Sequence, residues 1–190
     1  WPAANDHNLT PVRYVDWCDA AAYCRWNKKH LCGAIGKEAG VPFDPASAVD
    51  PAQSEWYNAC SAGGVNLYPY GSNTFDPTKC DGPGFAFPPN DPRKPMTDPL
   101  VPYLVQSAPG VPILANGCQG GAPNLYDMSG NVTEWENSCD DPADASTRCR
   151  ARGGTFWFKQ DSNCAPNAGD ESVRNDSTNP WVGIRCCWSP

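Results

Sequence analysis

The stretch Asn124-Leu-Tyr-Asp-Met-Ser-Gly-Asn-Val-Thr-Glu-Trp135 combines acidic, turn-forming and large apolar residues more densely than any other part of the chain. Its apolar side chains should be buried, whereas the charges of Asp127 and Glu134 are costly to bury unless something compensates them. Ser129-Gly130-Asn131 is a turn signal between two apolar halves, so the backbone can bring both carboxylates together. We therefore expect the rest of the chain to be built around this turn.

Two converging carboxylates and exposed turn carbonyls suit a hard cation such as calcium, which takes oxygen ligands at about 2.3 to 2.6 Å. The spacing is not that of an EF-hand. The alternative from residue types is that Asp127 caps a helix and Glu134 is a surface residue, with a turn between them. The residues of this stretch leave both interpretations open.

The composition predicts one domain over residues 1–190, since this length supports a sizeable core and nothing divides the chain. The 21 prolines and 17 glycines disfavour long helices, so regular structure should be sparse and coil abundant. Eight tryptophans and seven tyrosines can supply the core area of such a chain. A net charge of -7 opposes nucleic-acid binding and leaves little basic surface for anionic lipid.

The 11 cysteines include no Cys-x-x-Cys pair, and only two histidines accompany them, so they indicate a disulfide framework rather than a zinc module. We expect an oxidising compartment: extracellular, periplasmic or elsewhere in the secretory route. No apolar run is long enough to span a bilayer, and no signal peptide is visible. The opening Trp1-Pro2 suggests a processed or truncated product, with residues 1–10 as an N-terminal tail.

Periodicity predicts short elements separated by irregular coil. Two helices are predicted, at 18–27 and 51–60, and three strands, at 11–17, 152–158 and 182–187. Proline- and glycine-rich coil is expected at 33–52 and 68–122.

The first helix has the clearest pattern. Asp16 stands where it can cap the helix. Cys24 lies on the predicted apolar face, which Trp26 could extend. Lys28, Lys29 and His30 follow it; for His30 we favour a solvated position at the helix end over a role as ligand or base.

Several ordered motifs resemble the formylglycine-generating enzyme family, also called the sulfatase-modifying factor family. The resemblance implies a disulfide-rich α+β fold of the C-type-lectin-like kind. It runs from about residue 11 to the C-terminus and lacks the family's first strands, so we expect the C-terminal part of a longer or processed protein. The matching motifs are Pro11–Cys24, Glu55-Trp56, Tyr68-Pro-Tyr-Gly71, Leu125–Trp135, Arg152-Gly-Gly-Thr155 and Gly183-Ile-Arg-Cys186.

The resemblance implies a calcium site at the central turn. Carried over by position, its ligands are the side chains of Asp127 and Glu134 and the carbonyls of Gly130 and Val132. The resemblance therefore favours a bound cation over the alternative in which Asp127 caps a helix and Glu134 is a surface residue. A second calcium site of the family falls near Asp81, where the local pattern is too different to transfer.

The family's chemistry is oxidation of a substrate cysteine to formylglycine with oxygen and copper(I) held between two thiolates, which are suitable soft ligands. The matching positions here are Phe158 and Asn163, and neither can be a thiolate. Thr155 keeps the hydroxyl of the family's serine, which carries no redox chemistry by itself. Copper is therefore not expected, and no catalytic or cofactor-binding residue is assigned.

The resemblance also implies two disulfides, Cys24 with Cys186 and Cys60 with Cys164. The second would prevent Cys164 from holding copper. Proximity in sequence suggests the pairs Cys139–Cys149 and Cys80–Cys118, each stabilising by roughly 2 to 4 kcal/mol. For the remaining cysteines we prefer Cys18 with Cys32, leaving Cys187 as the odd thiol.

Three functions compete at this point. The first is a secreted or surface-exposed, non-catalytic module, braced by calcium and disulfides, that binds a protein or glycan. The second is a copper-dependent formylglycine-generating oxidase whose thiolates come from elsewhere, such as Cys164 with Cys187 or a cysteine of the absent N-terminal segment. The third is a structural subunit that contacts neighbouring chains of an extracellular assembly.

Three Asn-x-Ser/Thr patterns begin at Asn8, Asn131 and Asn175. We expect no glycan on Asn131, because its place in the central turn should hide it. Asn8 and Asn175 lie in polar segments that could be exposed.

Overall fold

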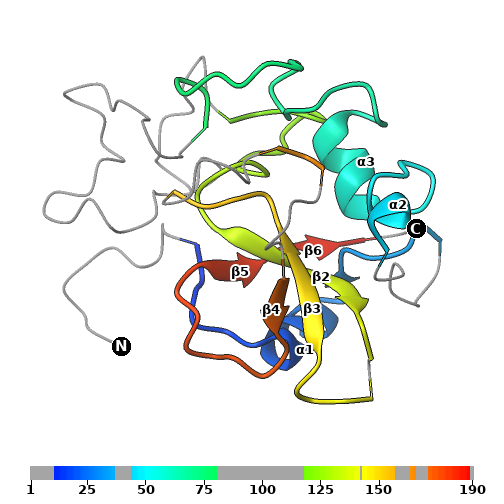
Figure 1. The fold of residues 1–190 in the computed structure, drawn as a ribbon, viewed down its shortest axis with the longest axis vertical. Helices are drawn as coiled ribbons and strands as arrows, with labels where there is room; N and C mark the ends of the chain where they lie inside the picture. The colour runs from blue at the N-terminus through cyan, green and yellow to red at the C-terminus, as the bar shows by residue number, and fades with distance from the viewer. Residues whose placement is uncertain are drawn as a thin grey trace, which may run out of the picture.

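The computed structural model of the protein describes residues 11–36, 44–80, 118–141, 143–156, 163–165 and 171–188. Short elements separated by coil confirm the predicted α+β class (Figure 1). In chain order they are α1 (Trp17–Trp26), β1 (His30–Leu31), α2 (Pro45–Ala48), α3 (Glu55–Ser61), β2 (Thr133–Cys139), β3 (Arg148–Arg152), β4 (Glu171–Val173), β5 (Val182–Ile184) and β6 (Cys186–Cys187).

Strand β2, which carries the end of the central stretch, lies inside a sheet of order β4-β3-β2-β5. It pairs antiparallel with β3, so that Glu134 lies opposite Arg152, and parallel with β5, so that Glu134 also lies opposite Gly183. A separate pair joins β1 to β6 antiparallel. The central turn is therefore brought next to the C-terminal strands, although about 50 residues separate them in sequence.

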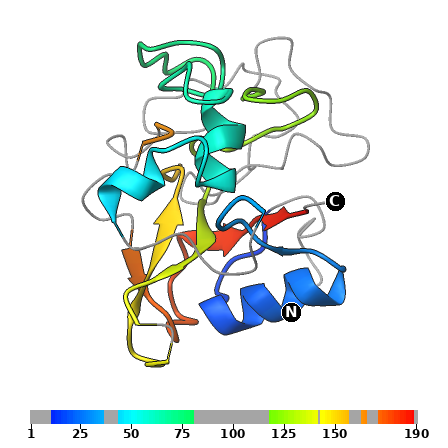
Figure 2. The ribbon, with the colours of Figure 1, turned by 90° about the vertical axis from the view of Figure 1, so that its right-hand side faces the viewer.

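Helix α1 forms because Asp16 caps it, accepting a hydrogen bond from the Asp19 N–H at 2.8 Å, and because one face is apolar. That face packs against Trp135 of β2 in the first core cluster. Figure 2 places α1 on one side of the strands, with α2 and α3 on the other. Trp26 is 78% exposed, so its predicted place on the buried face is wrong. The residues of α1 that are buried are Trp17, Ala20, Ala21 and Cys24.

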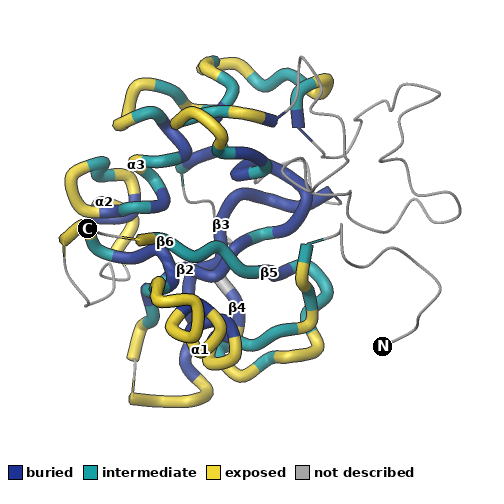
Figure 3. The backbone as a smooth tube through the Cα atoms, turned by 180° about the vertical axis from the view of Figure 1, so that it is seen from behind, coloured by how far each residue is buried: buried dark blue, intermediate teal, exposed yellow. Residues whose placement is uncertain are grey.

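Helix α3 supplies a second core cluster, in which Trp56 and Cys60 pack with Met128. Ser54 caps this helix by accepting from the Tyr57 N–H at 3.1 Å, so the helix begins at residue 55 and not at the predicted 51. It ends at Ala62, which adopts the left-handed conformation with φ 56°. In Figure 3 most of β2 and β3 is coloured as buried, whereas much of α1 is coloured as exposed.

Two of the predicted strands differ from the structure. Residues 11–16 form no strand, and Tyr14 has φ 58°, which interrupts extended backbone. The predicted strand at 152–158 instead ends at Arg152, because Gly153 and Gly154 take positive φ values of 103° and 70°. Its last two residues lie outside the described part of the chain. The closing strand is present but is divided into β5 and β6.

The cysteines form five disulfides. Four were expected: the structure pairs Cys24 with Cys186, Cys60 with Cys164, Cys80 with Cys118, and Cys139 with Cys149.

The predicted Cys18–Cys32 bridge and the free thiol at Cys187 are both wrong. Cys32 is joined to Cys187, because the antiparallel pairing of β1 with β6 brings their Cα atoms to 4.7 Å. Cys18 is a free thiol on the exposed side of α1.

His30 is also placed differently from the prediction. It lies on β1, and its Nε2 is 2.9 Å from Glu55 Oε2. Sequence proximity could not suggest this pair, because 25 residues separate its members.

No helix among the described residues is long and apolar enough to cross a membrane.

Candidate binding site at the central turn

The central turn is formed by unusual backbone conformations that neighbouring segments hold in place. Asp127, Gly130 and Asn131 have φ values of 60°, 73° and 63°. The Asp127 N–H donates to the Cys118 carbonyl at 2.9 Å, and the Gly130 N–H donates to the Gly153 carbonyl at 2.6 Å. Left-handed backbone at non-glycine residues persists only where the surroundings enforce it. The turn therefore has a fixed shape.

Glu134 accepts hydrogen bonds from two side chains that lie far from it in sequence. Its side chain is 6% exposed, and both carboxylate oxygens accept from Arg185 at 2.6 Å, one from Nε and one from Nη2. Trp56 Nε1 donates to Oε2 at 2.9 Å. The carboxylate is thus compensated within the protein by a bidentate guanidinium and an indole N–H.

Arg185 is held in turn by the groups around it. Its Nη2 also donates to the Tyr126 carbonyl at 2.9 Å. Burial acts to lower the pKa of Arg185, but the charge and hydrogen bonds of Glu134 and the charge of Asp127 outweigh it and hold the pKa above its usual value. The guanidinium is therefore charged in its pairing with Glu134.

A cavity of about 220 Å³ opens beside this ion pair. Asp127, Val132 and Glu134, three of the four residues expected at the calcium site, line it, whereas Gly130 does not. The structure thus places Asp127 and Glu134 in the lining of one cavity. The other lining residues are Pro11, Val12, Tyr23, Asn124, Tyr126, Asn131, Ile184 and Arg185.

The donor set at the cavity fits a hard cation in part. Its lining holds two carboxylates and one guanidinium, hence one net negative charge, and its amide side chains add oxygen donors. Within the described residues, no group of three or more His, Cys, Asp or Glu side chains could hold a metal. Calcium here would need Asp127 and Glu134 together with backbone carbonyls or water. When bound, it would neutralise carboxylates and brace the turn.

Arg185 is the site residue that sequence reasoning missed. It stands in the motif Gly183-Ile-Arg-Cys186, which supported the family resemblance, but nothing local in the sequence connects it with Glu134. The signal available was a general one: a buried carboxylate needs a partner.

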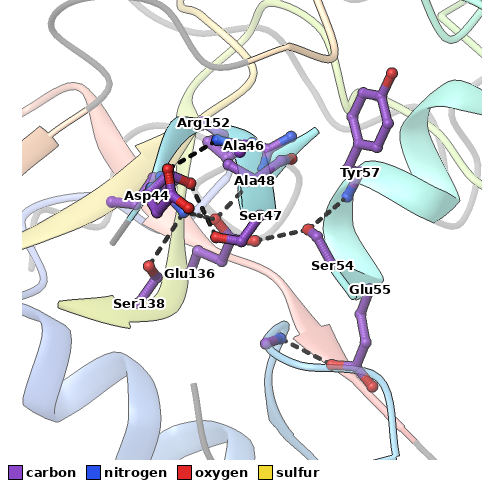
Figure 4. A network of polar contacts seen from close by, with 12 residues as sticks. Asp44, Ala46, Ser47, Ala48, Ser54, Glu55, Tyr57, Glu136, Ser138 and Arg152 are labelled. Atoms are coloured by element: carbon purple, nitrogen blue, oxygen red, sulfur yellow. Dashed lines mark hydrogen bonds and ion pairs between the residues drawn. The ribbon is translucent and has the colours of Figure 1, made fainter. Parts of the chain in front are cut away.

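A second acidic residue on β2 was also missed. Glu136 is fully buried, and its Oε2 lies 3.6 Å from Arg150 Nη1 and 3.5 Å from Arg152 Nη1. Ser54 Oγ donates to its Oε1 at 2.9 Å. Figure 4 shows this network between the sheet and the helices α2 and α3. Arg152 also donates to the carbonyls of Ala48 and Cys164, which ties α2 and the Cys164 segment to β3.

The positions that correspond to the copper thiolates do not form a thiolate pair. Phe158 lies outside the described residues, and Asn163 is half-buried. Cys164, next to Asn163, is buried and bridged to Cys60, so its sulfur is not available for copper. Thr155 is buried.

The glycan patterns lie in different environments. Asn131 is 2% exposed, and its carbonyl accepts from the Phe156 N–H at 2.9 Å, so the expectation of a hidden residue is confirmed. Asn175 is exposed, and Asn8 lies outside the described residues.

Comparison with known proteins gives consistent results. The model of the sulfatase-modifying factor enzyme 1-like domain matches residues 2–190. Two relatives, from Mus musculus and Bos taurus, are both named inactive C-alpha-formylglycine-generating enzyme 2. Each is 29% identical over 185 residues, covering 94% and 93% of this chain. The chain spans about half of their length, 49% in each case.

A solved structure, the crystal structure of CarF, is similar in fold. Its TM-score is 0.52 at 18% sequence identity, and the match covers 98% of this chain and 70% of that one.

Proposed function

This chain belongs to the sulfatase-modifying factor enzyme 1-like family, and we propose that it is a non-catalytic member that acts as a secreted binding module. One observation carries the proposal. The cysteine nearest to the family's copper positions, Cys164, is bridged to Cys60, and Asn163 beside it has no thiol. The family resemblance implies copper(I) held between two thiolates, which are suitable soft ligands. The names of the two relatives, which describe inactive enzymes, support the same conclusion.

The secreted location is supported by the cysteine chemistry. Ten of the 11 cysteines are paired in five disulfides, a pattern of oxidising compartments. We propose an extracellular or other secretory-route location on this ground.

We propose calcium as the brace of the central turn, with Asp127, Glu134 and the carbonyls of Gly130 and Val132 as ligands. The shared cavity and its net negative charge support this assignment. The ligand of the module would be a protein or glycan that contacts the rim beside the cavity. Tyr23, which lines the cavity and is 49% exposed, pairs there with the exposed Trp26, with ring centroids 6.2 Å apart. Exposed aromatic pairs are frequent in recognition surfaces.

Copper binding tests the non-catalytic assignment. The purified protein is titrated with copper(I) under anaerobic conditions and then supplied with oxygen and a cysteine-containing peptide. We expect no stoichiometric copper and no formylglycine by mass spectrometry. Stoichiometric binding with peptide oxidation would overturn the proposal. Phe158→Cys with Asn163→Cys is the matched positive variant, expected to gain copper(I) affinity because it restores both thiol positions.

Ligand binding is tested at the aromatic rim. Glycan arrays and binding to candidate secreted proteins are measured for the wild type and for Tyr23→Ala and Trp26→Ala. Val65→Ala is the control, because Val65 is exposed and does not line the cavity. We expect the rim variants to lose binding and the control to keep it. Equal binding by all variants would mean that the ligand does not bind at the rim formed by Tyr23 and Trp26.

A further inference from the structure

We propose that the C-terminal end of α1 and the residue after β6 together bind an acidic glycan, a polysaccharide chain that carries sulfate or carboxylate groups. The inference rests on the proposed binding function and deepens it by naming the chemical class of the ligand. We call this surface the aromatic-basic patch; it consists of Tyr23, Arg25, Trp26, Lys28, Lys29 and Trp188.

Two tryptophans of the patch are turned to solvent. Trp26 is 78% exposed and Trp188 is 67% exposed, although an indole contributes more area to a core than almost any other side chain. Tyr23 is exposed as well and lies beside Trp26, with ring centroids 6.2 Å apart. Large aromatic side chains that gather on a surface mark a place where a partner binds.

Strand pairing brings the residue after β6 to the end of α1. In the antiparallel pair of β1 with β6, His30 lies opposite Cys187, so the residues before His30 and after Cys187 leave the pair at the same end. The Lys29 N–H donates to the Cys24 carbonyl at 2.9 Å, and Cys24 is bridged to Cys186 of β6. Figure 2 shows α1 and β6 running toward the same side of the molecule.

The backbone under the patch is held in place before any ligand binds. The Lys28 N–H donates to the Arg25 carbonyl at 2.9 Å, which closes the last turn of α1. Two disulfides join β6 to α1 and to the residue after β1. A surface that is already ordered loses less conformational entropy on binding, so a small patch can bind with useful affinity.

The patch is basic, whereas the chain as a whole is acidic. Residues 20–36 contain Arg25, Lys28 and Lys29 and no Asp or Glu. These three side chains are exposed, and they take part in no ion pair among the described residues. With three positive charges here and −7 in total, the rest of the chain has a net charge of −10. Cations after a helix also favour its dipole, but this explains none of the exposed indoles.

This combination of charges and rings favours a glycan over a protein. A protein–protein interface of standard size covers about 800 Å² of each partner and is depleted in lysine. It would extend from the patch onto the acidic remainder of the chain, which repels an acidic partner. A polysaccharide is narrow enough to stay on the patch. Its anionic groups can pair with the cations, and the C–H groups of its sugars can pack on the indole rings.

The test uses heparin as a sulfated probe, polygalacturonate as a carboxylated probe and dextran as an uncharged control. Binding to the full chain is measured by isothermal titration calorimetry at about 50 and about 150 mM salt. We expect at least one acidic glycan to bind and dextran to bind at least about tenfold more weakly. Counterion release by three cations should weaken the acidic glycan by roughly 10- to 20-fold between the two salt concentrations, as for other polyanions.

Matched variants test the cations. Lys28→Gln combined with Lys29→Gln should weaken binding by about tenfold and reduce its salt dependence. Arg25→Gln should weaken it by about threefold. Arg148→Gln is the control, because it removes an exposed guanidinium from β3, outside the patch, and should stay within about twofold of the wild type. Thermal melting of each variant verifies that the fold is intact.

The rings are tested in the same way. Trp26→Ala and Trp188→Ala should each weaken the acidic glycan by about tenfold, whereas Trp26→Phe and Trp188→Phe, which keep a ring, should lose less. Equal binding by the alanine variants and the wild type would mean that the rings do not contact the ligand, and the inference would be wrong.

A poly-glutamate peptide and phosphatidylserine vesicles are the competing probes. If either binds through the patch as tightly as the acidic glycan, the patch recognises acidic peptides or membrane surfaces, and the inference is overturned. It is also overturned if neither heparin nor polygalacturonate binds, or if dextran binds as tightly as they do.

The failure of this inference differs from that of the proposed function. A neutral glycan or a protein that binds at Tyr23 and Trp26, without any acidic glycan doing so, leaves the binding module in place and removes only the ligand class. Stoichiometric copper(I) with peptide oxidation removes the non-catalytic assignment, whatever the glycan result.

Discussion

Glu134 and Glu136 stand two positions apart on β2, both directed toward α3, yet they have different surroundings. Glu134 meets one guanidinium at 2.6 Å beside an open cavity. Glu136 has no exposed surface and lies 3.5 to 3.6 Å from two guanidinium groups. Alternation along a strand places such residues on the same face, so the difference comes from what the neighbouring strands and helices contribute.

The comparison separates a carboxylate beside a cavity from one enclosed in the core. At Glu134 the guanidinium is partly exposed, and the cavity lining keeps one net negative charge. At Glu136 the arginines are buried. Arg150 Nη1 also donates to Ser138, and Arg152 donates through Nη1 and Nη2 to the backbone carbonyls of Ala48 and Cys164. A charge that is enclosed in this way has no surface to offer to a ligand.

The largest expected effect is at the buried carboxylate. Glu136→Gln keeps the shape but leaves Arg150 and Arg152 without their counter-charge, so we expect a loss of about 3 to 5 kcal/mol in the free energy of unfolding. Urea unfolding followed by tryptophan fluorescence measures it. The matched control is Glu134→Gln, which should lose less because Arg185 can be hydrated from the cavity. Equal losses for the two variants would contradict the distinction between the sites.

A smaller loss in the free energy of unfolding is expected at Trp56, whose indole contacts both sites. Trp56 Nε1 donates to Glu134, and its ring lies under the guanidinium of Arg152 at 4.5 Å. Trp56→Phe keeps an aromatic ring but removes a hydrogen bond to a charged group, which should cost about 1.5 to 3 kcal/mol. Chemical denaturation measures the loss. A double-mutant cycle with Glu134→Gln should show strong coupling, and additive effects would mean that this hydrogen bond is not formed.

Gly153 lies between the two sites, directly after Arg152, and connects to the turn through its carbonyl. Its φ of 103° disfavours any side chain, and a Cβ there would lie 2.8 Å from the Met128 carbonyl oxygen and 3.2 Å from the Trp56 ring. We expect Gly153→Ala to cost about 1 to 3 kcal/mol. Thermal melting measures it, with Gly36→Ala as control: that glycine also has positive φ but open space around it. A smaller loss for Gly153→Ala than for the control would show that the close contacts are absent.

The smallest effect is expected at the more exposed pair, His30 with Glu55. The His30 side chain is 34% exposed, and Glu55 also accepts from the Gly33 N–H at 2.8 Å. His30→Ala should therefore change the free energy of unfolding by about 0 to 1 kcal/mol, as for other surface pairs. Unfolding in urea at pH 8 and pH 5.5 tests this. A loss comparable to that of Glu136→Gln at either pH would mean that the His30–Glu55 pair stabilises the fold as much as the buried pairs of Glu136 do.

Local sequence patterns predicted much of this molecule. The cap at Asp16, the buried face of α1 with Cys24, the closing strand and the turn that brings Asp127 and Glu134 to one cavity all depend on residues close together in the chain. Caps, turns and periodicity are properties of a few neighbouring residues. Two disulfides were found differently, through the family resemblance, and the structure has both.

The wrong predictions concern features that residue types alone do not reveal: backbone conformation at two positions and the covering of a helix face at a third. Tyr14 and Gly153 end the predicted strands through backbone conformations that composition does not reveal. Trp26 continues the helical pattern of α1, but no element covers it in the part of the chain that the structure describes. Periodicity states which residues could share a face, and not how much of that face another element will cover.

The sequence by itself determined that Asp127 and Glu134 flank one turn and that the cysteines favour a disulfide framework, and, with the family resemblance, that the positions matching the copper ligands carry no cysteine. Only the tertiary structure decided which charge compensates Glu134 and which cysteine stays free. Arg185 is 51 residues from Glu134, and Cys187 is 155 residues from Cys32. Such partners are chosen by strand pairing, here β5 beside β2 and β6 beside β1. A register is a property of two segments together, so neither segment encodes it alone.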